Sequence, residues 1–582
     1  MNAYTQADRP MAVFTTLGAD RLLLTGVTGH ESISQLFRFQ LELVAEIGAE
    51  IPFDRLIGQS ITARLQLPDG NSRYFNGLVN RFTQGARDDS FVRFRAEIVP
   101  QIWLLTKKVR CRIFQHIVVP DILRHVFSGL QVNYELSATY HPRDYCVQYR
   151  ESDFNFASRI MEEEGIYYFF KHSEGRHEMV VTDAASQHPT VPGESAALYE
   201  ELRGSVHEDR RITAWEKSQE LRSGEYSLSD YCFEMPATDL QCHEKPIASI
   251  PVGKATHKLT LAGNDQLEIY DHPGGYAKRF DGIDRHGAAR PADLKHVFED
   301  RDRTVKIRME EEQAGSLKIE GAGDCGQFAA GHKFTLKGHF DGDGQYLLTR
   351  VEHNARQSGY RSDEVNEFEY CNRFTCIPAA LRYRPGREAP KPVIASVQTA
   401  TVVGPPGEEI FCDPYGRVKV HFHWDRDGKK DADSSCWLRV AQIWAGKRWG
   451  AFFWPRIGHE VVVAFEDGDP DQPLIVGSVY NADNMPPLAL PGTNMFCGIK
   501  SASVRGKANE NFNSIVFVDL KDQEHLALQS ERHMVLNAEF DVRHEAGRHH
   551  FQRIPSAHMT TVGNIPGGGS GGGPEPNQET SE

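Results

Sequence analysis

Short runs of alternating apolar and polar residues dominate the chain from residue 10 to about residue 380. Examples are VRFRAEIVP (92–100), HKLTLAG (257–263) and YLLTRVEH (346–353). Alternation with a period of two gives a strand one apolar face, and Gly, Asp and Asn break the pattern into short segments. The pattern therefore predicts a mainly β fold built of barrels or sandwiches.

Helices are expected at only three places. The clearest covers 150–164, with Ser152 as the N-cap and Gly165 as the residue that ends it. A second helix is predicted at 120–129, and a third within 276–304, which is rich in charged residues and alanine. The helices are too few to cover a large sheet, so strands must form most of the core.

Two segments with several prolines divide the chain. Proline fixes φ and removes a backbone donor, so 378–398 is predicted to be an extended linker, and PPLALPG (486–492) a second hinge. A compact β module is expected between them, at 399–485. The last stretch, 562–582, consists of Gly, Pro and polar residues and is predicted to be a flexible tail.

Residues 512–542 form a ribbon of a different kind. Most intervening positions are polar, although Ile515, Phe517 and Val535 break the pattern. Period-two alternation gives an apolar face that no helix covers, in a segment too short to close a barrel of its own. Three copies wound around one axis would bury this face, and two-fold packing of sheets is the alternative. The residues expected in this needle core are Phe512, Val516, Val518, Leu520, Leu526, Leu528, Met534, Leu536, Phe540 and Val542.

Charge and composition narrow the function classes. The 582 residues suit roughly three or four domains, and the net charge of −15, without a basic stripe, argues against a nucleic-acid surface. The N-terminus lacks the pattern of a secretory signal peptide, and no run approaches the ~18 apolar residues of a membrane span. The ten cysteines include no C-x-x-C pair and are expected to be buried, reduced thiols.

The segment GRVKVHFHWDRDGKKD (416–431) is the strongest candidate for chemistry. His421, His423 and Asp425 are spaced by two on a predicted strand, and together they suit the metal site of a hydrolase. Arg417 and Lys419 fall on the same face and would repel a metal ion. We therefore expect a solvated cationic strand face and no metal there.

Tryptophans cluster in the same module, at Trp437, Trp444, Trp449 and Trp454. They could stack single-stranded bases, as small five-stranded barrels do. The negative net charge favours the other interpretation, in which they pack in the barrel and at an oligomer interface.

Other catalytic patterns are missing from the sequence. It holds no G-x-S-x-G, H-E-x-x-H, P-loop or dinucleotide fingerprint. We predict no catalytic residues, no metal and no cofactor, and hence a protein that is not an enzyme.

Several segments carry a family resemblance. Residues 414–487, above all FEDGDPDQPLIVGSVYN (465–481), closely resemble the central domain of VgrG, the spike family of the bacterial type VI secretion system. The resemblance extends to LEIYDHPGGY (267–276), GHKFTLKGH (331–339), YLLTRVEH (346–353) and GIKSASVRGKANENFNSIVFVDLKDQEHLALQSERHM (498–534).

The resemblance implies an order of domains. They are an N-terminal arm (1–10), paired β-barrels like the phage T4-type baseplate hub (11–377), the proline-rich linker (378–398), an OB-fold barrel like that of the phage spike (399–485), a trimeric intertwined β-helix needle (486–561) and the tail (562–582). About 20 residues follow the needle, so we expect no fused effector domain, and the lysozyme domain of the phage relative is also expected to be missing.

The resemblance also implies partners and a location. A homotrimer would cap the Hcp tube with its hub-like base, carry a PAAR-type tip protein or effector, and puncture target membranes. An effector-loading chaperone is a further implied partner. The protein would be made in the bacterial cytoplasm and injected or secreted without a signal peptide. The residues expected to contact the tip partner are Met559, Thr560, Thr561 and Val562.

Overall fold

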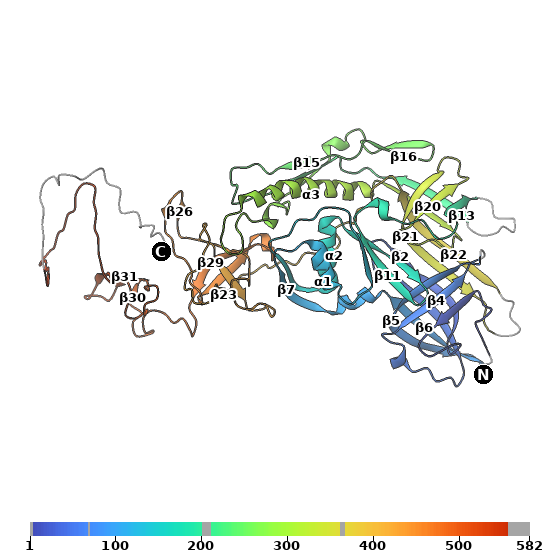
Figure 1. Cartoon of the computed structure of the whole chain (residues 1–582), viewed down its shortest axis with the longest axis horizontal. Coiled ribbons are helices and arrows are strands. Elements are labelled where there is room, and N and C mark those ends of the chain that lie inside the picture. The colour runs from blue at the N-terminus through green and yellow to red at the C-terminus, as the bar shows by residue number, and fades with distance from the viewer. Residues whose placement is uncertain (1–3, 68–69, 201–210, 361–366, 557–582) are drawn as a thin grey trace. The chain divides into compact units, whose positions relative to one another are not determined.

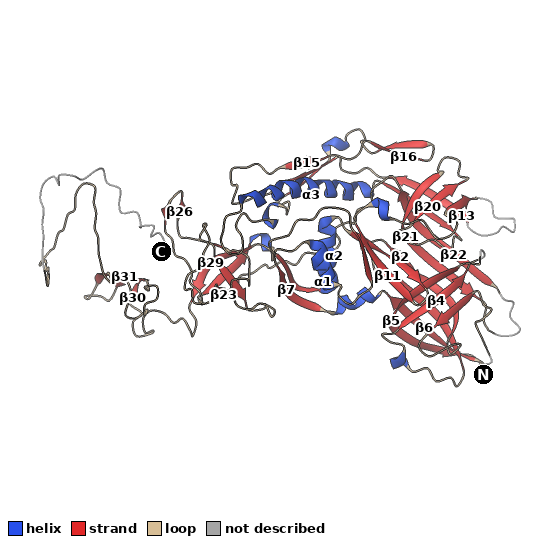
Figure 2. Ribbon diagram, in the orientation of Figure 1, coloured by secondary structure: helices blue, strands red, loops and turns tan. Residues whose placement is uncertain are grey.

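The computed structural model describes residues 4–67, 70–200, 211–360 and 367–556 (Figure 1). The chain divides into two compact units, Met1–Pro486 and Pro487–Glu582, and each is described by itself. Strands are far more common than helices in the first unit, as Figure 2 shows, so the predicted mainly β class is confirmed.

The first six strands form an antiparallel barrel wall. Their order in the sheet is β1 (Met11–Phe14), β4 (Ser60–Gln66), β5 (Ser72–Arg87), β6 (Phe91–Val99), β3 (Arg38–Glu46) and β2 (Leu23–Ser32). Side-chain amides join the two outer strands, because Gln6 Oε1 accepts hydrogen bonds from the backbone N–H of Val13 (2.9 Å) and Leu24 (3.2 Å). Gln357 Nε2 donates to the carbonyls of Met11 and Leu24, so this seam is satisfied without a backbone ladder.

A second set of six strands closes completely. Their order is β21 (Gly344–Gln357), β20 (Lys333–Lys337), β12 (Ala196–Tyr199), β13 (Arg211–Gln219), β19 (Leu317–Gly323) and β22 (Phe368–Pro378). β22 pairs back onto β21, which closes the ring, and β21 also pairs with β2 of the first barrel. The hub therefore consists of two β-barrels that share one continuous sheet, as the predicted fold class requires.

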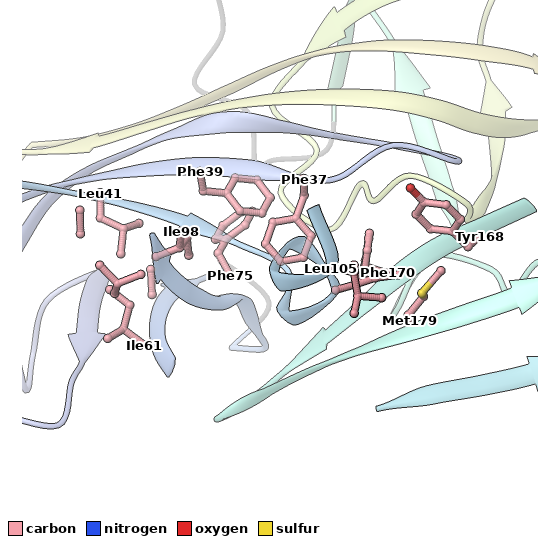
Figure 3. Packing of buried hydrophobic residues seen from close by; sticks show 14 of the residues in the cluster. Phe37, Phe39, Leu41, Ile61, Phe75, Ile98, Leu105, Tyr168, Phe170 and Met179 are labelled. Carbon is pink, nitrogen blue, oxygen red and sulfur yellow. The ribbon is translucent and has the colours of Figure 1, made fainter. Parts of the chain in front are cut away.

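Aromatic side chains fill the first barrel (Figure 3). Phe37, Phe39 and Phe75 are fully buried, and the Phe39 and Phe75 ring centroids lie 4.9 Å apart. The rings of Phe37 and Phe170 pack edge to face with centroids 4.9 Å apart. The core of the barrel therefore continues into the neighbouring sheet. Fully burying one such ring stabilises the fold by about 1.5–3 kcal/mol.

A buried charged cluster ties the two barrels together. Glu31 on β2 accepts a hydrogen bond from Arg73 on β5 (2.6 Å) and lies 3.0 Å from His353 Nε2 on β21. Burial alone would raise the pKa of Glu31, but the Arg73 charge and the His353 hydrogen bond outweigh it and lower the pKa to about 2. The ionised carboxylate is therefore stabilised in the folded state.

This cluster predicts a loss of stability in acid. A carboxyl whose pKa falls from its ordinary 4.5 to about 2 on folding stabilises the protein above pH 4.5, and the contribution disappears as the pH falls toward 2. We expect Glu31→Gln to reduce the loss of unfolding free energy between pH 7 and pH 3 by about 2 kcal/mol. Denaturant titration at both pH values measures the free energy of unfolding. Substitution of the exposed Glu352, as Glu352→Gln, is the control. Identical pH profiles for wild type and Glu31→Gln would contradict this assignment.

Two helices and two small sheets pack against the first barrel and share its core. The helices are α1 (Val119–Val126) and α2 (Asp153–Glu164), and the strands are β7 (Val109–Phe114), β8 (Val132–Glu135), β9 (Cys146–Ser152), β10 (Tyr167–Ser173) and β11 (Arg176–Thr182). Ser152 Oγ accepts from the Asn155 N–H at 3.0 Å, and Gly165 ends α2 in a left-handed conformation with φ of 69°. Both predicted caps are confirmed.

The third helix differs from its prediction. α3 runs Lys295–Ala314 and ends at Gly315, so the range 276–304 began too early and stopped too soon. Charge and alanine content favour helix but do not fix its ends, and a turn at Pro291–Leu294 precedes the first helical residue. α3 packs through Val297, Val305 and Met309. The strands in this part of the hub are β14 (Glu225–Leu228), β15 (Cys242–Glu244), β16 (Ser249–Val252), β17 (Ala255–Lys258) and β18 (Glu268–Asp271).

The rest of the first unit is a small barrel. Its strand order is β24 (Lys419–Phe422), β23 (Gln398–Val403), β28 (Glu460–Phe465), β29 (Pro473–Val479) and β25 (Arg439–Val440). A bridge between Val418 and Leu438 brings the first and last strands together. A hairpin of β26 (Ala445–Gly446) and β27 (Trp449–Gly450) follows β25. Five strands closed in this way match the predicted OB-fold barrel.

The second unit contains one antiparallel sheet. Its strands are β30 (Phe496–Lys500), β31 (Ser514–Val518) and β32 (His525–Gln529), in that order. Among the described residues, none of the helices is long and apolar enough to cross a bilayer. All ten cysteines fall in the described ranges and are free thiols, as predicted, but Cys371, Cys412 and Cys497 are exposed rather than buried.

Candidate functional site

The strand that carries His421 is buried on both faces. All four side chains of β24 are buried, and so is the neighbouring Arg417. The Arg417 guanidinium lies 2.6 Å from Asp413 and 2.7 Å from Asp281 of the hub. The prediction of a solvated cationic face is therefore wrong, because a hub loop with a matching carboxylate covers this face.

Lys419 is satisfied in a similar way. Its Nζ donates to the Ala432 carbonyl at 2.7 Å and lies 5.0 Å from the centre of the Trp437 ring. Burial lowers the pKa of Lys419. Cation–π contact and one hydrogen bond thus replace the water that the sequence pattern led us to expect.

The three residues that the hydrolase hypothesis requires, His421, His423 and Asp425, lie in different environments. His421 is buried, whereas His423 is exposed and its Nε2 lies 3.1 Å from Thr399 Oγ1. Asp425 Oδ1 accepts from the backbone N–H groups of Asp427 and Gly428, which makes it the cap of a turn. Within the described residues these side chains do not form a group with the spacing of metal ligands.

Salt bridges hold the small barrel against the hub and against the linker, which contributes Lys391. Lys391 Nζ lies 2.7 Å from Asp469 and 2.9 Å from Asp471, and Lys278 of the hub pairs with Glu466 at 2.5 Å. The Trp437 indole N–H donates to a hub carbonyl at 2.8 Å. Because these contacts involve buried or half-buried partners, they fix the barrel to the hub more firmly than surface pairs would.

A cavity of about 640 Å³ lies at this junction, and its walls are mostly charged. Arg143 on one wall pairs with Glu163 at 2.6 Å and with Glu164. Burial would raise the pKa of Glu164, but Arg303 and Arg143 lower it to about 2. Many of these charges form ion pairs with one another, which is typical of a structural junction rather than a ligand pocket.

The small barrel exposes a group of large apolar side chains around the β26–β27 hairpin. We call it the aromatic patch: Ile443, Trp444, Trp449, Phe452, Phe453 and Trp454. Ile443 is 88% exposed and Phe452 69% exposed. Of the four clustered tryptophans only Trp437 is buried, so packing within the barrel explains one of them. An exposed apolar patch of this kind marks an interaction surface.

The sheet of the second unit also has an exposed apolar face. Its register places Ile515 opposite both Ile499 and Leu528, and Phe517 opposite Leu526. Side chains of directly opposed residues lie on the same face of an antiparallel sheet. We call these five residues the apolar sheet face, and the four on β31 and β32 are 44–57% exposed.

This register changes the needle core predicted from the sequence. Val516 and Val518 lie opposite Ala527 and His525, on the other face from Leu526 and Leu528. Placing all even-numbered positions on one face was therefore wrong, because the turn between β31 and β32 changes which positions share a face. Ile515 and Phe517, which seemed to break the pattern, belong to the apolar side.

The remaining predicted core residues lie outside these paired strands. Phe512 precedes β31, and Leu520 is exposed in the turn that follows it. Met534, Leu536, Phe540 and Val542 are exposed in a segment with no assigned strand up to residue 556. Their role in a needle stays a prediction. The expected tip contacts Met559, Thr560, Thr561 and Val562 lie outside the described residues.

The structure brings together one group that the sequence analysis missed. His141, His296 and Glu299 point their ligand atoms at one another. The available signal was H-x-x-E at 296–299 in a predicted helical region, which places both side chains on one helix face. Nothing in the sequence indicated that His141 would join them.

Two family comparisons match successive parts of the chain. Residues 30–359 match the phage tail baseplate hub (GPD) family. Residues 412–480 match the type VI secretion system/phage-baseplate injector OB domain. These ranges fall on the paired barrels and on the five-stranded barrel.

Relatives and a solved structure agree with these matches. The chain is 38% identical to the Pseudomonas aeruginosa type VI secretion system spike protein VgrG1c, over 94% of this chain and 71% of the relative. It is 37% identical to VgrG1a of the same organism, over 90% and 78%. A solved E. coli component of the type VI secretion system, described as similar to the T4 phage tail proteins gp27 and gp5, superposes with a TM-score of 0.53 at 18% identity, over 80% of this chain and 99% of that one.

Proposed function

The chain belongs to the VgrG family of type VI secretion system spike proteins, and on that premise we propose that three copies assemble by covering one another's apolar faces. As a structural spike of the system, the protein must resist compression along its axis. Intertwined strands suit this task, because they pair backbone groups between chains and leave no open sheet edge. The trimer would be obligate, with a needle that does not fold in a single chain.

The observation that carries this proposal is the apolar sheet face. Leu526 and Leu528 are each more than half exposed in one chain, beside Ile515 and Phe517. Burying exposed apolar surface stabilises an interface by about 25 cal/mol per Å². The aromatic patch adds a second exposed surface on the small barrel. Obligate interfaces are large and apolar, so both surfaces suit contacts between copies.

The remaining partners follow from the family and belong to the proposal. The hub would sit on the Hcp tube, and the needle point would hold a PAAR-type tip protein or effector, loaded with or without a chaperone. After synthesis in the cytoplasm the spike would be secreted and would cross a target membrane. The domain boundaries 11–377, 399–485 and 486–561 are kept in this proposal as the sequence analysis gave them.

A non-enzymatic role fits the family and the geometry better than the two alternatives. The hydrolase alternative needs His421, His423 and Asp425 in one site, and their different burial and partners argue against it. The single-strand-binding alternative needs a basic groove beside the exposed tryptophans, whereas the chain carries a net charge of −15. We assign the tryptophans to contacts between protein chains.

The tip can be tested by a short deletion. Removing residues 552–564 should abolish co-purification of a PAAR-type tip protein, because the end of the needle is lost. The protein should remain a trimer. Pull-down of a tagged tip protein and light scattering measure the two effects. A deletion of the same length in the tail, 567–579, serves as control. Undiminished capture of the tip protein by the 552–564 deletion would count against this placement.

A further inference from the structure

The start of α3 and a distant hub loop bring three metal-ligand side chains together. His296 and Glu299 are three residues apart in the first turn of the helix, and His141 comes from the segment between β8 and β9. Glu299 Oε2 lies 2.8 Å from His296 Nδ1 and 3.0 Å from His141 Nε2. One ligand atom from each residue falls within 4.8 Å of the others.

We propose that His141, His296 and Glu299 bind a divalent cation of the zinc class, with solvent as the fourth ligand. Two imidazoles and one carboxylate, with one position open, form a donor set that zinc takes in proteins. Bonds of about 2.0–2.2 Å around a tetrahedral ion require ligand atoms ~3.3–3.6 Å apart. The two separations from Glu299 need to open by about 0.3–0.8 Å, which rotation of the half-exposed Glu299 side chain supplies.

The surroundings hold the two imidazoles in place. Their rings stack with centroids 4.0 Å apart, and the Phe280 ring packs against both, at 6.2 Å from His141 and 5.8 Å from His296. Both histidines are about three-quarters buried, whereas the Glu299 side chain is half exposed. The apolar ring restricts rotation of the histidines, and the open side at Glu299 leaves a path for the ion.

A cavity beside His296 leaves room for a solvent ligand. Its volume is about 530 Å³. Its charged lining includes four carboxylates and two guanidinium groups, from Asp144, Asp281, Asp284, Asp293, Arg285 and Arg290. Two of these carboxylates are already paired, Asp281 with Arg417 and Asp284 with Arg290, so the contribution of the cavity to the site is room for a solvent ligand.

The competing explanation needs no ion. Glu299 would simply accept hydrogen bonds from both imidazoles and so fasten the start of α3 to the hub. The two explanations differ for Glu299→Gln. The amide oxygen of glutamine still accepts hydrogen bonds, but it lacks the negative charge that a zinc ligand supplies.

Zinc titration of the full chain distinguishes the metal site from a hydrogen-bonded cluster without an ion. The chain is first stripped with a chelator, and His549→Gln and His550→Gln are introduced to weaken zinc binding by the His-rich segment RHEAGRHHF (543–551). We expect one Zn²⁺ per chain by calorimetry, with micromolar affinity, and a higher thermal midpoint with Zn²⁺. Glu299→Gln and His296→Gln should each weaken binding at least about tenfold, because loss of an outer-shell partner alone has that effect.

His286→Gln is the matched control, because His286 lines the same cavity but is not in the cluster. Its zinc affinity should equal that of the parent chain. Cobalt offers a second readout, since a four-coordinate Co²⁺ site absorbs visible light in the parent chain and not in Glu299→Gln. Equal zinc affinity of the parent chain and Glu299→Gln, or failure of the parent chain to bind Zn²⁺ in the micromolar range, would overturn the proposal.

Discussion

Replacing Leu526 and Leu528 with Asp is expected to convert the trimer into single chains. Both leucines lie on the apolar sheet face and are more than half exposed in one chain. Six leucine side chains would leave the interface of one trimer, and since each is only about half exposed in one chain, covering it contributes roughly half of the 1.5–3 kcal/mol of full burial. Six carboxylates would have to be buried in their place, which costs more still. Sedimentation or light scattering measures the change in mass.

The control places the same charges on the same strand. His525→Asp and Gln529→Asp lie on β32 but on the opposite face, where Val518 and Ser514 are their partners. This variant should keep the mass of the wild type. If both double variants dissociate equally, the strand is sensitive to charge in general, and the apolar sheet face has no special role.

Replacing Arg417 with Met is expected to lower the unfolding free energy of the small barrel by about 3–5 kcal/mol. The guanidinium is almost fully buried between Asp413, which is also fully buried, and Asp281 of the hub. Without it both carboxylates lose their ion-pair partner and keep only backbone N–H donors, since methionine fills the space but offers neither charge nor a side-chain donor. The pKa of Arg417 is raised by these carboxylates against the opposing effect of burial.

Denaturant unfolding followed by tryptophan fluorescence measures this loss, because Trp437 and Arg417 line the same small cavity. Arg426→Met, at an exposed position a few residues along, is the control and should change the free energy by less than about 0.5 kcal/mol. A loss below about 1 kcal/mol for Arg417→Met would mean that the junction does not depend on this ion pair.

The sequence predicted structural features correctly where they depend on residues that are close together in the chain. Ser152 and Gly165 cap α2 as expected, because a cap acts within one helical turn. Short-range alternation also holds at β24, since Val420 and Phe422 lie in the core of the small barrel. Alternation over short runs indicated the β class of the hub.

The errors share a physical cause, which is contact with distant residues. Arg417 was assigned to solvent because Asp281, far away in the chain, cannot be read from the local pattern. Ile515 was assigned to the wrong face because a turn, not the numbering, sets the register. His141 was missed because only the fold brings it to His296.

The central claim is that sister copies of this chain cover the apolar sheet face. Native mass spectrometry of the purified full chain tests it most directly. The account predicts a single species with three times the 65.5 kDa mass of the chain. A folded species at the mass of one chain, stable at micromolar concentration, would contradict it.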